Sequence, residues 1–236
     1  MKIALVGQKG GVGKTVLSQL LVNAILAKED AVRVLLIDTD PQLSSAAYHH
    51  RALASYPDLE HRFICWKCAD EEQLSQSLQN ANELDLDYVI IDTAGSHRDL
   101  TKYVLAEADK ALIPFRPNLK EYESQLATLQ LYEEVRAVML EADLEPPIVK
   151  LVLNDWSEKQ RMTNDQKSIL AGIFNEPLLA DFYVPSRNGF DTLDQGYVMF
   201  KELDNPEVTS NPFVLKSRRE ELAIAVDTLQ KIELMQ

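Results

Sequence analysis

The sequence predicts an α/β fold in which a mostly parallel, twisted sheet is flanked by helices on both faces. Two features of the 236-residue chain support this prediction. Short apolar runs alternate along the chain with segments whose apolar residues recur at helical spacing, as expected when strands and helices follow one another. The apolar runs are continuous rather than alternating, which is typical of parallel strands buried on both faces.

The first half of the chain contains the clearest strand and helix patterns. Residues 3–6 form an apolar run that ends at Gly7, which predicts a strand followed by a turn. In residues 14–27 the apolar side chains recur every three or four positions, which predicts a helix. Further apolar runs predict strands at 32–37, 62–66 and 88–91, and helices are expected at 70–80 and 100–108.

The second half continues the same alternation. A strand is expected at 111–115, and a long helix at 119–141 should end before Pro146-Pro147. The remaining elements predicted are strands at 148–153 and 178–184 and helices at 161–174 and 218–234. Ligands of such sheets bind beyond the carboxyl ends of the strands. The residues that follow predicted strand ends are Gly7, Asp38, Asp92 and Asn154.

Composition limits the possible protein classes. The length suits one large domain spanning residues 1–236, and 46% hydrophobic with 26% charged residues is ordinary for a globular protein. A net charge of -13 and a pI near 4.8 disfavour nucleic-acid binding by the whole surface but leave room for a local basic patch. No apolar run approaches the roughly 20 residues of a membrane span, and the N-terminus lacks a signal-peptide pattern. We therefore expect a cytoplasmic protein whose two cysteines are reduced.

A glycine-rich segment between the first predicted strand and helix matches the phosphate-binding P-loop pattern. The segment reads Gly7-Gln8-Lys9-Gly10-Gly11-Val12-Gly13-Lys14-Thr15. Backbone N–H groups from Gly10 to Thr15 can face phosphate oxygens, and the following helix adds its positive N-terminal dipole. Lys14 is expected to reach the β- and γ-phosphates of ATP, and the Thr15 hydroxyl to bind Mg²⁺. A glycine-rich turn without a ligand is the alternative.

Carboxylates follow two of the predicted strands. Asp38 and Asp40 come after the second strand, and Asp92 after the fourth, followed by Gly95. Mg²⁺ prefers oxygen ligands, and one or two carboxylates suffice because the ion keeps several waters. A glycine at position 95 would let its loop respond to the γ-phosphate as a switch. Helix N-capping is the alternative role for these aspartates.

The string Lys9-Gly10-Gly11-Val12-Gly13-Lys14-Thr15 resembles the deviant Walker A motif of the ParA/MinD family of ATPases. The Asp38-Thr39-Asp40-Pro41-Gln42 segment resembles a second motif of that family. The resemblance implies that two ATP molecules lie between two subunits, with Lys9 acting on the partner's nucleotide. It also implies that Asp40 orients the attacking water and that Asp38 and Asp92, with Thr15, support Mg²⁺. It extends from residue 2 to the last helix and is looser after about residue 150.

The same resemblance assigns a base pocket. It places Asn154 near adenine, with Pro185 and Arg187 flanking the base. This chain has Ser186 between the proline and the arginine, where many relatives have the two adjacent. Gly196 matches a glycine that follows in the family.

Partners are also implied by the resemblance. We expect a homodimer when ATP is bound, a ParB-like or cargo adaptor protein, and slow, partner-stimulated ATP hydrolysis. Partition members of the family bind DNA nonspecifically through basic residues near the C-terminus, and Lys216, Arg218 and Arg219 are the candidates here. Such binding would associate the protein with the nucleoid. The polar face of the last predicted helix carries Glu220 and Glu221, so membrane anchoring is not expected.

Other functions remain open from the sequence. A ParA-like recruiter in a conjugative transfer system and a metabolic enzyme resembling dethiobiotin synthetase share the same motifs. A nitrogenase iron-protein role is disfavoured because Cys65 and Cys68 come too early for its cluster ligands. Their C-x-x-C spacing supplies only two of the four ligands that a structural zinc site needs. His49-His50-Arg51 could contact phosphate or DNA, but we expect it to be a solvated helix end.

Overall fold

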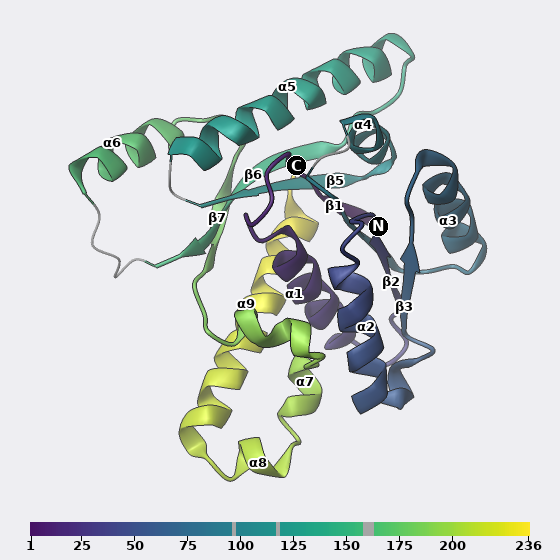
Figure 1. The fold of residues 1–236 in the computed structure, drawn as a ribbon, viewed down its shortest axis with the longest axis vertical. Helices are drawn as coiled ribbons and strands as arrows, with labels where there is room; N and C mark the ends of the chain where they lie inside the picture. Colours follow the sequence, from purple (N-terminus) through teal and green to yellow (C-terminus); the bar gives the residue numbers. More distant parts are fainter. Residues whose placement is uncertain (96–97, 117–118, 158–162) are drawn as a thin grey trace. The chain divides into compact units, whose positions relative to one another are not determined.

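The computed structural model describes residues 1–95, 98–116, 119–157 and 163–236 (Figure 1). Seven strands form a sheet in the order β3-β2-β4-β1-β5-β6-β7. The strands are β1 (Lys2–Leu5), β2 (Val34–Asp38), β3 (Phe63–Lys67), β4 (Tyr88–Asp92), β5 (Lys110–Phe115), β6 (Ile148–Trp156) and β7 (Leu179–Pro185). The pairs β1–β5, β2–β3, β2–β4, β5–β6 and β6–β7 all run parallel, which confirms the predicted fold class.

Helices connect the strands. They are α1 (Lys14–Leu26), α2 (Ser44–Ser55), α3 (Glu71–Glu83), α4 (Arg98–Glu107), α5 (Leu119–Glu141), α6 (Asn164–Ile173), α7 (Met199–Glu202), α8 (Pro206–Thr209) and α9 (Pro212–Leu234). Short 3-10 helices occur at Pro57–Leu59 and Phe190–Gln195. No helix in the described parts of the chain is long and apolar enough to cross a bilayer.

The chain divides into two compact units, which we describe separately. The first unit consists mainly of Thr15–Asp92 and Arg187–Met235, and the second of Lys2–Lys14 and Thr93–Ser186. Aspartates at the ends of β2 and β4 therefore belong to the first unit, whereas most of the glycine-rich loop belongs to the second.

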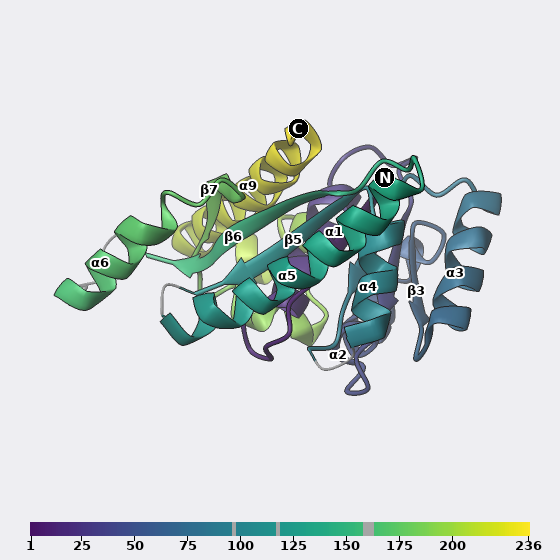
Figure 2. The same ribbon diagram turned by 90° about the horizontal axis from the view of Figure 1, so that it is seen from above.

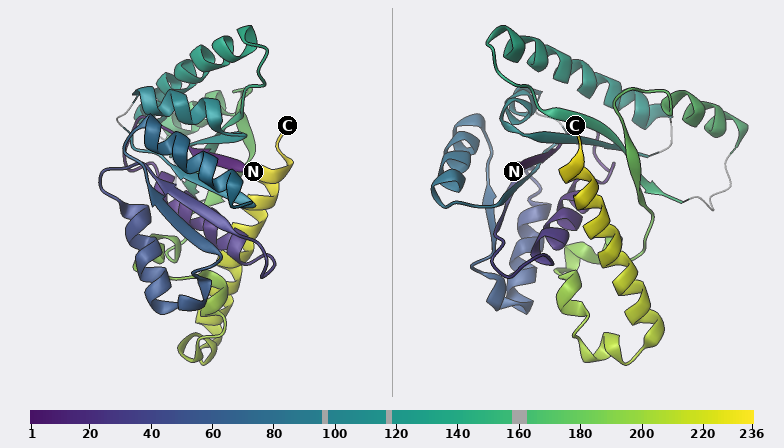
Figure 3. Two further views of the ribbon diagram at one scale, coloured as in Figure 1. Left: turned by 90° about the vertical axis from the view of Figure 1, so that its right-hand side faces the viewer. Right: turned by 180° about the vertical axis from the view of Figure 1, so that it is seen from behind.

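The first unit is built around β2. All five residues of β2 are buried, between β3 on one side and β4 on the other. Helix α2 packs against β2 and β3, and the rings of Tyr48 and Phe63 lie 5.8 Å apart there. Helix α9 has α7 and α8 beside its first turns (Figure 3). The far end of α9 is fixed by Glu233, which accepts hydrogen bonds from Lys28 and Tyr88.

A buried asparagine joins three segments of the first unit. The Asn23 side-chain amide of α1 donates to the Tyr48 hydroxyl of α2 at 2.9 Å. Its Oδ1 accepts from the backbone N–H of Met199, the first residue of α7, at 2.7 Å. Because Asn23 is fully buried, each of these bonds satisfies a group that water does not reach.

The second unit is built around β5, which lies between β1 and β6. Helix α5 packs along β5 and against α4 (Figure 2). Toward its C-terminal end, α5 buries an apolar face of Leu131, Val135 and Met139. Nearer its N-terminus the same face is polar, which brings polar groups next to the glycine-rich loop.

The main differences from the predicted elements concern the last third of the chain and one missed helix. The helix expected at 218–234 begins at Pro212, because the Asn211 side chain accepts from the N–H groups of Phe213 and Val214 and caps it. Strand β6 continues past residue 153 to Trp156, and part of the helix expected at 161–174 lies outside the described residues. The bounds of helix α2 were not predicted and residues 49–51 lie inside it instead of at its end, because only Ser45, Tyr48 and Ala52 of its residues are buried and its apolar pattern is weak.

The Asn23 network generates a stability prediction. Asn23→Ala removes the hydrogen bonds that Asn23 makes to the Tyr48 hydroxyl and to the Met199 N–H. It should lower the free energy of unfolding by about 2 to 3 kcal/mol. Tyr48→Phe keeps the ring and removes one hydroxyl, and should cost about 1 kcal/mol. Urea denaturation of both variants measures the difference. Equal losses would show that Asn23 does not organise the contact between α1, α2 and α7.

Candidate functional site

The glycine-rich loop of the second unit turns through two left-handed residues. Gly11 has φ of 79° and Gly13 has φ of 92°, a region that residues with a side chain rarely adopt. At Gly13 a Cβ atom would lie 2.1 Å from Nδ2 of Asn154, so no side chain fits there. A Cβ at Gly10 or Gly11 would meet nothing within 4 Å, which leaves the space beside this part of the loop open.

Asn154, near the end of β6, holds the loop in this shape. Its side-chain amide is buried and donates to the backbone carbonyl of Val12 at 2.9 Å. The bond orients the peptide that precedes Gly13, and therefore the neighbouring N–H groups. Sequence reasoning selected Asn154 for the base pocket; the structure places its amide on the loop backbone, and a contact with adenine stays a prediction.

The two lysines of the loop have different surroundings. Lys14 is almost completely buried, and its ammonium group donates to the backbone carbonyl of Lys9 at 3.0 Å. The charge of Lys14 therefore lies inside the curve of its own loop, where a phosphate group would need it. Lys9 is more exposed, and its ammonium group lies 3.7 Å from a carboxylate oxygen of Glu121 on α5.

Helix α5 contacts the loop at further points that the sequence analysis did not identify. Thr128 accepts from the backbone N–H of Gln8 at 3.3 Å and donates to Gln125 at 3.4 Å. The Oε1 atom of Gln125 lies 2.9 Å from the place where a Cβ of Gly7 would be. Glu121, Gln125 and Thr128 recur at helical spacing and are buried, so they form one polar stripe on α5. Their helical spacing can be seen in the sequence, but it does not show that this face of α5 packs against the loop.

The loop after β4 also touches the glycine-rich loop. Thr93 donates its hydroxyl to the backbone carbonyl of Leu5 at 2.7 Å, which fixes the start of this segment on β1. A Cβ at Gly95 would lie 2.9 Å from the carbonyl oxygen of Gln8. Only glycine allows this close approach, so the residue proposed as a switch lies directly against the phosphate loop.

In the first unit, two carboxylates lie side by side at the strand ends. Asp38 and Asp92 are register partners on β2 and β4, and both are buried. Asp92 accepts from the Ser45 hydroxyl at 2.7 Å. Asp38 accepts from the backbone N–H groups of Asp40 and Ala46 at 3.0 and 2.9 Å. The bond from Ala46, in the first turn of α2, means that the capping role considered for Asp38 is also present.

Burial raises the pKa of Asp38 above its ordinary value, although the backbone hydrogen bonds oppose the shift. Since the folded pKa is raised, the stability that the protonated carboxyl contributes is present below the unfolded pKa. It is lost as the pH rises through the folded value. At neutral pH the ionised Asp38 is therefore a cost to folding, and a cation beside it would offset that cost.

The remaining predicted site residues are placed as follows. Asp40 accepts from the backbone N–H of Gln42 at 2.9 Å and is partly exposed. Thr15 is half-buried in the first turn of α1. Pro185 ends β7. Arg187 lies 3.3 Å from Glu220 of α9. Gly196 has a left-handed conformation and packs against Arg51, which gives it a structural role in the first unit.

The candidate DNA-binding residues lie on α9 among acidic neighbours. Arg218 pairs with Glu221 at 2.9 Å and stacks over the Tyr197 ring. Lys216 lies 3.9 Å from Glu220, and Arg219 is exposed. His49 does not face solvent as a phosphate contact: its Nε2 is 3.1 Å from the Phe63 carbonyl oxygen, and burial lowers its pKa.

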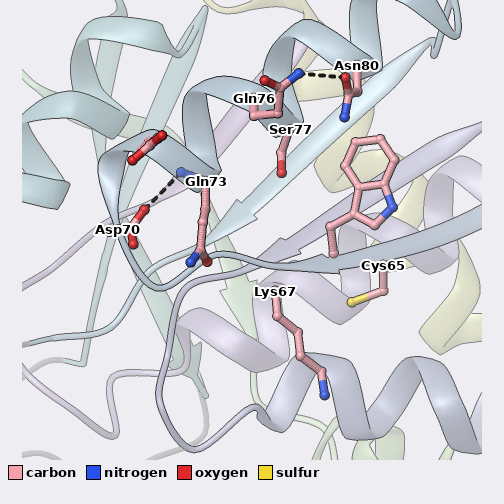
Figure 4. A pocket seen from close by; sticks show the side chains of 9 residues that line it. Cys65, Lys67, Asp70, Gln73, Gln76, Ser77 and Asn80 are labelled. Atoms are coloured by element: carbon pink, nitrogen blue, oxygen red, sulfur yellow. Dashed lines mark hydrogen bonds between the residues drawn. The ribbon is translucent and has the colours of Figure 1, made fainter.

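The C-x-x-C pair is not arranged for redox or metal chemistry. Both cysteines are free thiols, and burial raises the pKa of Cys65 to about 12 and that of Cys68 above its ordinary value. Such thiols remain protonated at neutral pH and are weak nucleophiles. Cys65 lines an open pocket of about 810 Å³ between β3 and α3. There Cys65 and Lys67 point away from Gln76, Ser77 and Asn80 (Figure 4).

Metal binding by side chains alone is limited in the described residues. They contain no group of three or more His, Cys, Asp or Glu that could hold a metal ion. The first unit contains the carboxylates of Asp38 and Asp92 and the hydroxyl of Thr15. Oxygen ligands of this kind suit Mg²⁺, which takes its other ligands from water and phosphate. The open, left-handed turns of the loop and the buried Lys14 likewise fit a nucleotide phosphate chain.

The geometry at Gly13 predicts a large difference between two glycine substitutions in the same loop. Gly13→Ala should lower the free energy of unfolding by about 2 to 3 kcal/mol, because it adds strain and displaces the Asn154 amide. Gly10→Ala should change it by less than about 0.5 kcal/mol. Chemical denaturation of both variants provides the comparison. If the two substitutions cost the same, Asn154 does not constrain the loop.

Comparisons with known proteins agree with this geometry. The sequence model of the CobQ/CobB/MinD/ParA nucleotide binding domain matches residues 3–196. Protein VirC1 of Rhizobium radiobacter is 28% identical over 159 residues, which span 67% of this chain and 65% of VirC1. Apo McdA of Cyanothece superposes with a TM-score of 0.63 at 18% identity, over 95% of this chain and 98% of McdA.

A Borrelia burgdorferi plasmid partition protein bound to AMPPNP gives a TM-score of 0.57 at 19% identity. That match covers 96% of this chain and 98% of the partition protein. At these identities the structural matches establish the fold alone, whereas the family model spans most of the chain and includes the phosphate loop and both aspartate segments. This protein belongs to the CobQ/CobB/MinD/ParA family of nucleotide-binding proteins.

Proposed function

We propose that this protein is a ParA-type ATPase that forms an ATP-sandwich dimer and acts in DNA partitioning or cargo positioning. The observation that carries the proposal is the presence of two lysines, Lys9 and Lys14, in one phosphate loop, one directed inward and the other held near the surface. Family membership supports ATP binding and hydrolysis. The similarity to a plasmid partition protein and to McdA supports the partition-type role.

In this proposal the chain's residues divide the work on ATP. Backbone N–H groups of Gly10 to Thr15 bind the phosphates, and Lys14 gives up the Lys9 carbonyl to reach the β- and γ-phosphates. Thr15, Asp38 and Asp92, which belong to the same compact unit, would hold Mg²⁺. The ion neutralises phosphate charge when it is bound. Asp40 orients the attacking water, and Asn154, Pro185 and Arg187 are proposed for the base pocket.

Dimerisation supplies a positive charge that each nucleotide site lacks in the single subunit. Lys9 of one subunit acts on the nucleotide of the other, as an arginine finger supplied in trans does. Hydrolysis in the isolated subunit should therefore be slow, and a ParB-like or cargo adaptor protein is proposed to stimulate it. Release of phosphate then returns the dimer to monomers.

Nonspecific DNA binding by the dimer is proposed to use Lys216, Arg218 and Arg219 of α9. Arg219 is exposed, and the ion pairs of Lys216 and Arg218 are ones that phosphate groups could compete for. Glu220 and Glu221, which follow these residues and pair with Lys216 and Arg218, keep the single subunit's affinity low. Two clusters in one dimer would raise the affinity through simultaneous contacts.

A metabolic role is the second candidate, because the family also includes the CobQ and CobB groups. Such an enzyme would bind a small acid at the dimer interface instead of DNA. A recruiting role in a conjugative transfer system would keep the ATPase cycle and change only the protein partner.

Removal of Lys14 tests the nucleotide site. Lys14→Ala should weaken ATP binding roughly 10- to 100-fold, because it deletes a charge-assisted contact to phosphate. Lys167→Ala, at an exposed position of α6, is the control and should bind normally. Titration with a fluorescent ATP analogue measures both affinities. Unchanged binding by Lys14→Ala would refute the assignment of the phosphate site.

Charge reversal on α9 tests the DNA surface. With Mg²⁺ and ATP, the double variant Lys216→Glu/Arg219→Glu should no longer retain DNA at low salt while still dimerising. The log–log salt dependence should flatten by about 0.9 for each DNA phosphate that the variant no longer neutralises. Lys231→Glu, an exposed change elsewhere on α9, serves as the control. If wild-type protein dimerises but retains no DNA, the partition-type role gives way to the metabolic or recruiting one.

A further inference from the structure

The ion pair between Lys9 and Glu121 joins the phosphate loop to the first turn of α5. The ammonium nitrogen and a carboxylate oxygen are 3.7 Å apart, and the two side chains are 38% and 12% exposed. A largely buried carboxylate next to a phosphate-binding loop is unfavourable for anion binding on electrostatic grounds. Its position therefore needs an explanation beyond surface charge.

The carboxylate of Glu121 is held in place by more than Lys9. One oxygen, Oε2, accepts from the backbone N–H of Arg116 at 3.0 Å, and the other, Oε1, faces Lys9. Gln125 and Thr128 continue the polar stripe and contact Gly7 and Gln8. The three residues of α5 thus contact the three consecutive loop residues that precede Gly10.

A simpler explanation is that Glu121 only stabilises α5. An acid in the first turn of a helix modestly stabilises the helix through its dipole. Glu123 lies two residues further along the helix, is exposed, and can serve the dipole in the same way without touching the loop. The burial of Glu121 and its aim toward Lys9 are what the dipole alone does not explain.

We propose that Glu121 is a positioning residue that holds Lys9 within its own subunit until ATP and a second subunit are bound. This inference rests on the proposed function, because it concerns the lysine that acts in trans. The phosphates of the partner's nucleotide compete with Glu121 for the Lys9 ammonium group. Dimerisation therefore has to open one such pair in each subunit, and Glu121 sets how readily the sandwich forms.

The first test detects the ion pair directly. A zero-length carbodiimide joins amines to carboxylates that are in contact, so the nucleotide-free protein should yield a Lys9–Glu121 linked peptide in the monomer band. Mg²⁺ with AMPPNP, at protein concentrations where the dimer forms, should reduce its yield several-fold. Absence of the linked peptide without nucleotide, or an unchanged yield with nucleotide, would overturn the proposal.

The second test measures dimerisation with Mg²⁺ and AMPPNP by sedimentation. Glu121→Gln keeps an acceptor for Arg116 and removes the charge. It should tighten the dimer roughly threefold for each pair opened, hence roughly tenfold in total. Glu123→Gln should have no effect. In a Lys9→Ala background, Glu121→Gln should also have no effect, because the ion pair with Lys9 is already gone.

The outcomes separate this inference from the proposed function. If Glu121→Gln and Glu123→Gln change the dimer affinity equally, or if the effect of Glu121→Gln persists without Lys9, the proposal is wrong. Glu121 then acts on helix stability or through its charge on the protein as a whole. If wild-type protein never dimerises with AMPPNP, the proposed function fails. The cross-linking yield without nucleotide then decides alone whether Glu121 holds Lys9 within its own subunit.

Discussion

The shape of the phosphate loop depends on one buried hydrogen bond, from the Asn154 amide to the Val12 carbonyl. It ties the loop to β6, and it occupies the space that any side chain at position 13 would need. With the loop fixed on that side, Gly13 adopts its left-handed conformation and Lys14 lies inside the curve against the Lys9 carbonyl. A loop fixed in this way lowers the ordering cost of binding a ligand beside it.

On its other side the loop is held by contacts with α5, whereas Asn154 holds it to the sheet. Its polar stripe contacts the loop residues before Gly10, and Glu121 gives Lys9 a partner inside the subunit. The two lysines of the loop are thus prepared differently. In the proposed mechanism Lys14 acts on the nucleotide of its own subunit, whereas the ion pair that holds Lys9 is weak enough to be exchanged. On this proposal, the difference between the two lysines leaves the site incomplete in one subunit.

Much of this site could be predicted from the sequence because its signals are local. The phosphate loop is a contiguous motif, and Asp38 and Asp92 follow apolar runs whose carboxyl ends meet at one edge of a parallel sheet. The roles of Glu121, Gln125 and Thr128 could not be predicted, because they depend on which face of α5 packs against the loop. The ion pair of Arg187 with Glu220 likewise depends on tertiary packing. Helix α2 was missed because a helix with three buried residues leaves little periodic signal.

The central claim, that Lys9 completes the site of the other subunit, can be tested by mixing two inactive variants. Lys9→Ala keeps Asp40 but lacks the trans lysine, and Asp40→Ala keeps Lys9 but lacks the water-orienting carboxylate. In a mixed dimer one of the two sites is complete, so an equal mixture should recover about a quarter of the wild-type ATPase rate. A mixture that forms mixed dimers, verified with two affinity tags, yet hydrolyses ATP no faster than the separate variants would contradict the account.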